Sequence, residues 1–256
     1  MFLNPANHTS PPQKIISLVP SITELLFTLG LEEQTIGITK FCIHPSNWFT
    51  TKQKIGGTKN INIQKIIALA PDLIIANKEE NVKEQVEELA SLFPVYLTEV
   101  NSYASALQMI LEVGVITNRK KEAKNIAENI EINLEKNITC KQKINVAYLI
   151  WKDPYMTIGG DTFISNLLEK IGLENGYKNE KRYPQITIED LQTAQPDVVL
   201  LSSEPYPFKE KHLLELKNHF PQTKILLADG EMFSWYGSRM LLMPAYFKKL
   251  IEEIGS

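Results

Sequence analysis

Residues 61–75 read INIQKIIALAPDLII, and residues 186–200 read ITIEDLQTAQPDVVL. Both segments place Pro-Asp at the same point, with apolar residues after it and the N-cap candidates Asn62 and Thr187 near the start. Asn and Thr favour the N-cap of a helix, and a residue before proline avoids helical angles. Each segment therefore predicts a short helix, a turn at Pro-Asp and a buried strand.

A second pair of matching segments lies upstream of the first pair. Residues 25–32 read LLFTLGLE and residues 167–174 read LLEKIGLE, each typical of a helix end with a glycine stop. Two matches in the same order, together with alternating strand and helix signals, predict two similar lobes. The predicted fold class is α/β, with two Rossmann-like lobes joined by a single long backbone helix. The N-terminal lobe is expected over residues 14–116, the linking helix over 117–139 and the C-terminal lobe over 140–256.

The linking helix is the longest polar helical segment, residues 119–138. About 20 residues at about 1.5 Å each span roughly 30 Å, the diameter of a small domain. A strut along two lobes and an ordinary surface helix of one domain both fit this pattern. Arg119 is out of place at the start, because the helix dipole favours acidic residues there. The apolar residues form one stripe at helical spacing: Ala123, Ile126, Ala127, Ile130, Leu134 and Ile138.

Three local patterns add detail to this division. Residues 21–24, Ser-Ile-Thr-Glu, predict a capping box that begins a helix after the first strand. Residues 103–116 predict a helix that ends before the linking helix. Residues 238–254 predict a final helix that is interrupted near Pro244, since proline lacks the backbone N–H that a helix interior needs.

The composition narrows the functional class. The chain of 256 residues is 43% hydrophobic with a net charge of −3, so it can bury a core but lacks the basic excess typical of nucleic-acid binding. Two cysteines, Cys42 and Cys140, exclude a disulfide-dense scaffold. No apolar run is long enough to cross a membrane. The first residues do not read as a secretory signal, so we expect either a cytoplasmic protein or one whose signal has been removed.

Strong catalytic motifs are missing from the sequence. It has no phosphate-binding loop, no GxGxxG fingerprint, no HExxH and no GxSxG elbow. Cys42 and His44 form a CxH pair of metal-ligating types, but two ligands do not complete a zinc site. An α/β enzyme that uses His44 with Cys42 or Asp161 is therefore kept as the weaker alternative.

Aromatic and charged residues collect in four loops, which are residues 41–48, 151–155, 183–184 and 234–239. Three of these loops follow predicted strands, and ligands of α/β sheets bind outside the carboxyl ends of the strands. A shared binding cleft accounts for the whole set, whereas the alternative is that each aromatic residue packs onto its own lobe. Arg239 opens a predicted helix, a poor place for a cation, which indicates another role.

At this point the sequence resembles the helical-backbone, or class III, binding proteins of ABC importers for metal chelates, and most of all the members that bind cobalamin. The resemblance covers about residues 14–254. Its motifs include the Pro-Ser-x-Thr-Glu-Leu and Leu-x-Pro-Asp-Leu-Ile phrases. The segments that carry it are IISLVPSITELLFTLGL (15–31), IGITKFCIHP (36–45), INIQKIIALAPDLIIA (61–76), YPQITIEDLQTAQPDVVLL (183–201) and WYGSRMLL (235–242).

The resemblance implies a substrate-binding protein, not an enzyme, that holds a corrinoid such as cobalamin in a cleft between the lobes, with no covalent cofactor. Haem and a ferric siderophore are the alternative ligands. Flat aromatic faces suit such a ligand, and an arginine suits its amide or phosphate oxygens. His44 is also the candidate axial ligand of the central metal. The implied ligand-binding residues are Phe41, His44, Trp151, Tyr183, Trp235 and Arg239.

The family docks its ABC permease through one glutamate on each lobe. Glu189 matches one of them, whereas the equivalent position of the first lobe is Gln64. The resemblance implies a periplasmic, monomeric protein with a chelate and a permease as partners, and with no nucleic acid or membrane insertion. Gln64 and the missing signal favour a second hypothesis, a cytoplasmic chelate carrier or sensor without a transporter.

Overall fold

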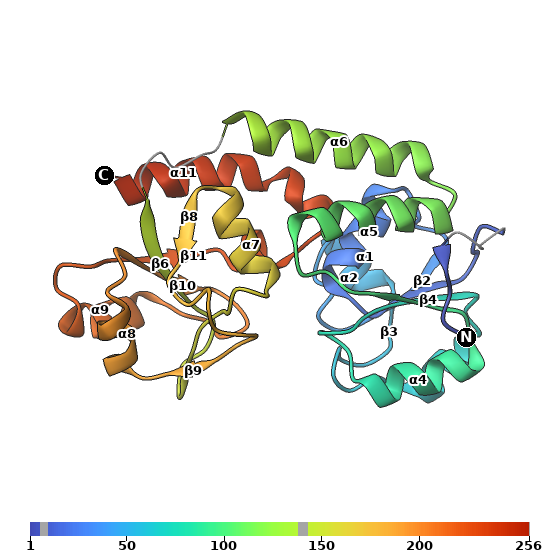
Figure 1. Ribbon diagram of the computed structural model, residues 1–256. Helices are drawn as coiled ribbons and strands as arrows, with labels where there is room; N and C mark the ends of the chain where they lie inside the picture. The colour runs from blue at the N-terminus through green and yellow to red at the C-terminus, as the bar shows by residue number, and fades with distance from the viewer. Residues whose placement is uncertain (6–9, 138–142, 256) are drawn as a thin grey trace. The chain divides into compact units, whose positions relative to one another are not determined.

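The computed structural model describes residues 1–5, 10–137 and 143–255 (Figure 1). Contacts within the chain divide it into two compact units. Each unit contains a parallel sheet with helices, so the predicted α/β fold class with two lobes is confirmed.

Each unit includes one short segment from the part of the chain that otherwise forms the other unit. Unit 1 contains Met1–Val100 and Ala104–Glu131, and it also takes in Tyr236–Leu241. Unit 2 contains Ile132–Trp235 and the chain from Leu242 onward, and it takes in Asn101–Tyr103. The predicted domain boundaries follow the order of the chain and remain a prediction. Those boundaries do not include the two short segments, Asn101–Tyr103 and Tyr236–Leu241, that each group with the other unit.

Unit 1 is built on a five-stranded sheet with the strand order β3-β2-β1-β4-β5. β1 pairs in parallel with both β2 and β4, which makes it the central strand. Its residues Ile15 and Ile16 are fully buried, as expected for a strand that is covered on both faces. The strands are β1 (Ile15–Ser17), β2 (Thr35–Ile38), β3 (Gln53–Lys54), β4 (Leu73–Asn77) and β5 (Val95–Thr98).

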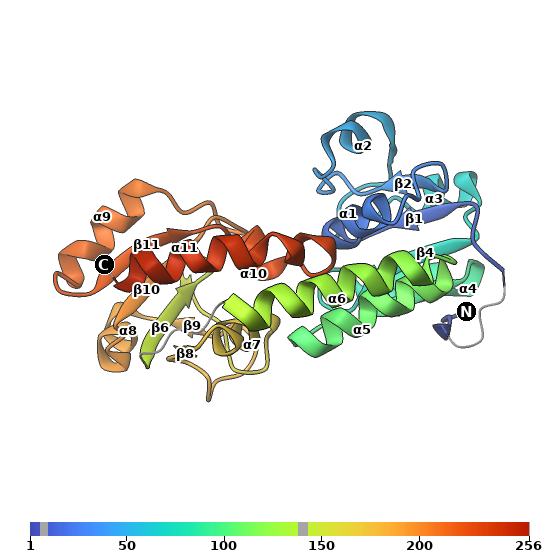
Figure 2. The same ribbon diagram turned by 90° about the horizontal axis from the view of Figure 1, so that it is seen from above.

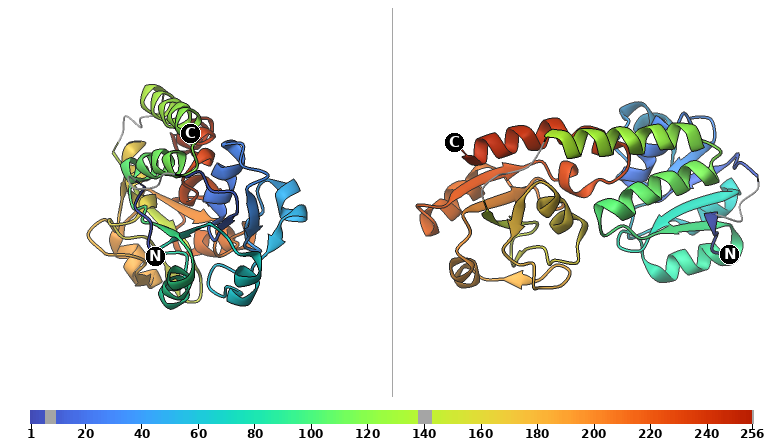
Figure 3. Two further views of the ribbon diagram at one scale, coloured as in Figure 1. Left: turned by 90° about the vertical axis from the view of Figure 1, so that its right-hand side faces the viewer. Right: turned by 45° about the horizontal axis from the view of Figure 1, so that its top comes forward.

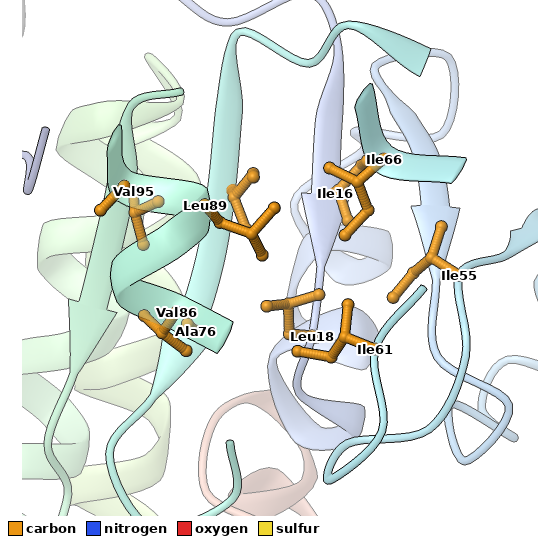
Figure 4. Packing of buried hydrophobic residues seen from close by; sticks show 11 residues of the cluster. Ile16, Leu18, Ile55, Ile61, Ile66, Ala76, Val86, Leu89 and Val95 are labelled. Atoms are coloured by element: carbon orange, nitrogen blue, oxygen red, sulfur yellow. The ribbon is translucent and has the colours of Figure 1, made fainter. Parts of the chain in front are cut away.

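Helices cover both faces of this sheet. On one face, Ile66 of α3 and Val86 and Leu89 of α4 pack over apolar residues of the strands (Figure 4). On the other side lie α1 and α5, and α5 runs beside α6 (Figure 2). The helices are α1 (Pro20–Thr28), α2 (Ser46–Thr51), α3 (Ile63–Leu69), α4 (Lys83–Leu92), α5 (Tyr103–Ile116) and α6 (Lys120–Asn137).

Unit 2 is built on a four-stranded parallel sheet with the order β11-β10-β6-β8. A short antiparallel pair, β7 with β9, stands apart from it. The strands are β6 (Ile144–Leu149), β7 (Tyr155–Met156), β8 (Leu173–Asn175), β9 (Gln185–Ile186), β10 (Val198–Ser202) and β11 (Lys224–Ala228). The helices are α7 (Phe163–Lys170), α8 (Ile188–Ala194), α9 (Glu210–His219), α10 (Glu231–Ser234), the 3₁₀ helix η2 (Ser238–Leu241), which belongs to unit 1, and α11 (Met243–Gly255).

The two faces of the unit 2 sheet carry different side chains. Leu191 of α8 and Leu216 of α9 join a hydrophobic core on one face, which also contains Phe208 and Phe220. On the other face lies α11 (Figure 3). There the ring of Tyr148 lies 4.9 Å from Phe233, and Phe233 lies 5.0 Å from Phe247 of α11. Successive side chains of β6 therefore pack on opposite faces of the sheet, as the two-residue period of a strand requires.

The sequence repeat has a structural basis in each unit. Asn62 and Thr187 are N-caps whose side chains accept from the backbone of Lys65 and Asp190. After the Pro-Asp turn, Asp72 accepts backbone N–H groups that lead into β1, at 2.7 and 2.8 Å. Asp197 accepts the N–H of Asn145, the second residue of β6, at 2.7 Å. The repeated aspartate therefore ties the start of one strand to its neighbour.

The predicted capping box at residues 21–24 is wrong. The N-cap of α1 is Val19, which makes no side-chain cap, and Pro20 is the first helical residue. Proline suits this first position because its fixed φ is helical and its missing N–H would have no partner there. Ser21 is thus inside the helix, and Glu24 bonds to Arg239 instead of to the helix start.

The predicted linking helix is α6, whose residues up to Glu131 group with unit 1 and from Ile132 with unit 2. Its stripe from Ala123 to Leu134 is buried, and Ile138 lies outside the described residues. Arg119 precedes the helix, and its Nε donates to the carbonyl of Leu29 at 3.1 Å. Arg119 therefore binds the carboxyl end of α1, where a cation is favourable.

Candidate functional site

In unit 1, the candidate residues follow β2 at the carboxyl edge of the sheet. Phe41 is 50% exposed, and the Lys40 ammonium lies 5.1 Å from the centre of its ring. His44 is half-buried in the same loop. An exposed aromatic ring with a cation beside it offers a stacking face for a flat, electron-rich ligand.

Cys42 lies between these two residues but does not share their surface. Its side chain is fully buried, and its Sγ lies 3.1 Å from Thr23 Oγ1 and 3.2 Å from Thr39 Oγ1. Burial raises the pKa of the Cys42 thiol. A neutral, enclosed thiol serves neither as a nucleophile nor as a metal ligand, since both roles need the thiolate.

Unit 2 carries an aromatic group at the carboxyl ends of β6 and β10. Trp151 is 40% exposed, and its ring meets Tyr206 edge-on with centres 5.6 Å apart. Tyr206 in turn packs on Phe208 at 4.7 Å and on His212 at 5.4 Å. The backbone N–H of Tyr206 donates to the carbonyl of Ile150 at 3.3 Å, which fixes its loop to the end of β6.

We call Trp151, Tyr206, Phe208 and His212 the aromatic cluster. Among them, only Trp151 was predicted from the sequence as a ligand-binding residue. Tyr206 lies between two prolines in the loop that follows β10. Because ligands of α/β sheets bind at loops that follow strands, this position could have identified Tyr206 from the sequence.

Tyr183 lies just before β9 and is half-buried. The guanidinium of Arg182 lies 5.8 Å from the centre of its ring, and the Arg182 backbone has a left-handed φ of 58°. The backbone N–H of Arg182 donates to the carboxylate of Asp161 at 2.6 Å. Asp161 therefore holds the turn that carries Tyr183, a structural role that differs from acid–base chemistry.

Trp235 and Arg239 are both 7% exposed. The indole Nε1 of Trp235 donates to Glu204 at 2.9 Å within unit 2. The guanidinium of Arg239 donates to both oxygens of Glu24, at 2.8 and 2.7 Å, within unit 1. These contacts are enough to explain why both side chains are held in place, and direct contact with a ligand remains a prediction for both.

The two predicted docking residues occupy equivalent places. Gln64 is the second residue of α3 and Glu189 the second residue of α8, and both are exposed. A carboxylate is favourable in the first turn of a helix, and Glu189 has that position while Gln64 carries no charge. Their docking role remains a prediction.

Within the described residues, no group of three His, Cys, Asp or Glu side chains is placed to hold a metal ion. Cys140 and His8 lie outside those residues. Among the described residues, no helix is both long enough and apolar enough to cross a bilayer.

Curated relatives of the chain include proteins with named ligands. The vitamin B12-binding protein of Vibrio campbellii is 26% identical over 207 residues, covering 79% of this chain and 75% of the relative. The substrate-binding lipoprotein YvrC of a Bacillus subtilis ABC transporter is 26% identical over 201 residues, covering 74% of this chain and 63% of the relative.

Solved structures share the fold. The periplasmic vitamin B12-binding protein of Vibrio cholerae has a TM-score of 0.77 at 20% identity, covering 96% of this chain and 99% of its own. The periplasmic heme-binding protein of the same species has a TM-score of 0.79 at 20% identity, covering 93% and 98%. A family model described as periplasmic binding protein matches residues 15–224. Because that match spans most of the sequence, the chain belongs to the periplasmic binding protein family.

Proposed function

We propose that the protein is the substrate-binding component of an ABC-type importer and that its ligand is a flat metal chelate, with a corrinoid as the first candidate. The exposed ring of Trp151, supported edge-on by Tyr206 at the carboxyl edge of the unit 2 sheet, carries this proposal. Relatives named for vitamin B12 support the corrinoid, and heme-binding structural neighbours support haem as the alternative. A ferric siderophore is the third candidate.

A metal ion in a tetrapyrrole needs little from the protein. The macrocycle supplies four nitrogen ligands, so one axial side chain completes the site. His44, half-buried beside the exposed Phe41, is the candidate for that ligand. A chelate that brings its own donors is consistent with a chain whose described residues show no three-ligand cluster.

Titration with three ligands tests this function. Cyanocobalamin, hemin and a ferric siderophore are added separately to the purified full chain, and binding is followed by quenching of tryptophan fluorescence. We expect at least one dissociation constant in the micromolar range or below. The absence of binding by all three would overturn the proposal.

A pair of variants then locates the ligand. Trp151→Ala removes the exposed ring and is expected to weaken binding by at least tenfold, since buried aromatic anchors dominate binding energy. Leu214→Ala removes another large exposed side chain, 63% exposed on α9, and is expected to leave binding unchanged. Equal affinity of the two variants would show that Trp151 is not part of the ligand surface.

Transport outside the cytoplasm, with an ABC permease as partner, follows from the same proposal. The uncharged Gln64 at the position equivalent to Glu189 favours the alternative, a chelate carrier or sensor without a permease. Deletion of the gene separates the two. Loss of chelate uptake by whole cells is expected for an importer component, whereas unchanged uptake would favour the carrier.

A further inference from the structure

We propose that the hydroxyl group of Tyr206 donates a hydrogen bond to the ligand, and that His212 is the positioning residue that makes the hydroxyl available for it. This inference rests on the proposed function and names a ligand-contact residue that neither the sequence analysis nor the relatives assign. The ligand atom it requires is an acceptor oxygen, a carboxylate or a carboxamide, on the rim of a flat molecule that stacks on Trp151.

The two ring nitrogens of His212 have different hydrogen-bond partners. Its Nδ1 lies 2.9 Å from the backbone nitrogen of Lys209, and a backbone N–H can only donate. Nδ1 therefore carries no proton. His212 is 5% exposed, and burial, with Lys211 and Lys152 nearby, lowers its pKa. The ring is therefore neutral near pH 7, and its single proton is on Nε2.

The position of that proton decides the role of Tyr206. The His212 Nε2 lies 3.3 Å from the Tyr206 hydroxyl oxygen. Since Nε2 carries the hydrogen, the histidine donates and the phenol oxygen accepts. The hydroxyl hydrogen of Tyr206 has no acceptor among the described residues, so it remains available to an acceptor from outside the chain.

The surroundings of Tyr206 keep its ring in one place. Trp151 packs on one edge, Phe208 lies at 4.7 Å, and Ile150 binds the backbone. A fixed donor next to an exposed indole can recognise a flat ligand in two ways at once, through stacking and through one directed hydrogen bond. Such a donor adds specificity because its alignment is set before the ligand arrives.

Two Tyr→Phe variants test the hydroxyl itself. Tyr206→Phe keeps the ring and is expected to weaken binding of cyanocobalamin or hemin on the order of tenfold, the effect of one lost hydrogen bond. Tyr177→Phe is the matched control in unit 2, because the Tyr177 hydroxyl is buried, finds no hydrogen-bond partner among the described residues and is shielded from a ligand. The control is expected to bind as the natural chain does.

Two variants of His212 test its positioning role. An asparagine oxygen can replace Nδ1 as acceptor for Lys209, but it leaves Tyr206 without a donor. A glutamine can reach Tyr206 with its amide N–H. We expect His212→Asn to weaken binding nearly as much as Tyr206→Phe does, and His212→Gln to restore part of the affinity. Nitrogen NMR of the natural chain should show the proton of His212 on Nε2.

The outcomes separate the inference from the function. If the natural chain binds a chelate but Tyr206→Phe and Tyr177→Phe bind it equally well, the inference is overturned and the proposed function stands. A His212 proton found on Nδ1 would overturn it as well. If the natural chain binds none of the chelates, the proposed function is overturned and the inference with it.

Discussion

Arg239 and Glu24 form a paired hydrogen-bonded ion pair across 215 positions of the sequence, with Nε to Oε2 at 2.8 Å and Nη2 to Oε1 at 2.7 Å. Their side chains are 8% and 17% exposed. The pair joins η2 to α1 inside unit 1, so it anchors a segment whose neighbours in the chain belong to unit 2. A buried charge without its partner is costly, which makes the pair a strong constraint on the position of η2.

Arg239→Met should therefore destabilise unit 1. We expect the free energy of unfolding to fall by about 3 kcal/mol, because Glu24 is left as a buried charge without its cation. The measurement is urea unfolding of the full chain. Lys78→Met is the control, since it breaks the exposed pair with Glu99, and it should cost less than about 1 kcal/mol.

The double variant Glu24→Gln/Arg239→Met provides a second check. It should lose less stability than the sum of the two single variants, because removal of both partners leaves no isolated charge. An Arg239→Met chain of unchanged stability that no longer binds the chelate would contradict the anchoring role and support a direct ligand contact.

Local patterns in the sequence predicted much of the fold. The helix expected over residues 103–116 is α5 with the same bounds, and the Pro-Asp repeat marks equivalent turns in both units. These signals are local, since caps, turns and apolar periodicity depend on nearby residues. Family membership was also within reach, because the repeat and its motifs are contiguous in the chain.

Long-range partners could not be predicted in the same way. Glu24 has the spacing of a capping residue, and nothing near it in the sequence indicates Arg239 as its partner. Arg119 looked misplaced at a helix start for the same reason, because its acceptor is the carbonyl of Leu29 in a distant helix. Tyr206 joins Trp151 only through the pairing of β6 with β10, so the aromatic cluster became visible only in three dimensions.

Glu204 gives a prediction about charge in unit 2. Burial raises the pKa of its carboxyl group, and Glu231 and Asp229 add to the rise, against hydrogen bonds from Ser234 and Trp235. The folded pKa lies above the unfolded value, so the charged form weakens the folded state at neutral pH, and stability from this group is gained as pH falls through the folded pKa.

Glu204→Gln removes this charge and keeps an oxygen for the Trp235 indole. We expect it to raise the free energy of unfolding at pH 7 by about 1 kcal/mol, the scale of an ordinary single substitution. The gain should shrink as the pH falls. Urea unfolding at several pH values measures it, with Glu169→Gln, an exposed glutamate of α7, as the control. A less stable Glu204→Gln chain at pH 7 would show that the hydrogen bonds of the carboxylate outweigh its desolvation.

His212 predicts the opposite pH dependence. Burial lowers its pKa, so the unfolded chain binds the proton more readily, and stability is lost as pH falls below the ordinary value of about 6.5. Protonation also removes the acceptor of the Lys209 N–H, a hydrogen bond of about 1 kcal/mol. The charged neighbours are Lys211 and Glu215 on the same helix and Lys152 from the loop after β6, and Tyr206 is the titratable neighbour from the loop after β10.

The comparison variant is His212→Asn, which keeps an acceptor and does not titrate. Thermal unfolding from pH 7.5 to pH 5 should show a steeper loss for the natural chain than for this variant. The other groups that titrate in this range are common to both chains, so the difference isolates His212. Parallel curves would mean that His212 has an ordinary pKa.

Gly114 predicts how closely α5 and α6 must pack. A Cβ added at this position would lie 2.3 Å from the Cβ of Ala123 and 3.0 Å from the carbonyl oxygen of Arg119. Both distances are shorter than normal contacts, and the carbonyl belongs to the backbone, which cannot move away easily. In an isolated helix, Gly→Ala would be favourable by about 1 kcal/mol, so the packing and the helix propensity oppose each other here.

We expect packing to win, and Gly114→Ala to lower the free energy of unfolding by about 1–3 kcal/mol, as overpacked sites do. Gly255→Ala is the matched control at the end of α11, because its added Cβ would meet no atom of the described residues within 4 Å, and it should be neutral or slightly stabilising. Urea unfolding compares the two. A Gly114→Ala chain as stable as Gly255→Ala would mean that α6 can shift away from α5. The double variant Gly114→Ala/Ala123→Gly removes the opposing methyl group of Ala123. It should restore most of the stability that Gly114→Ala loses.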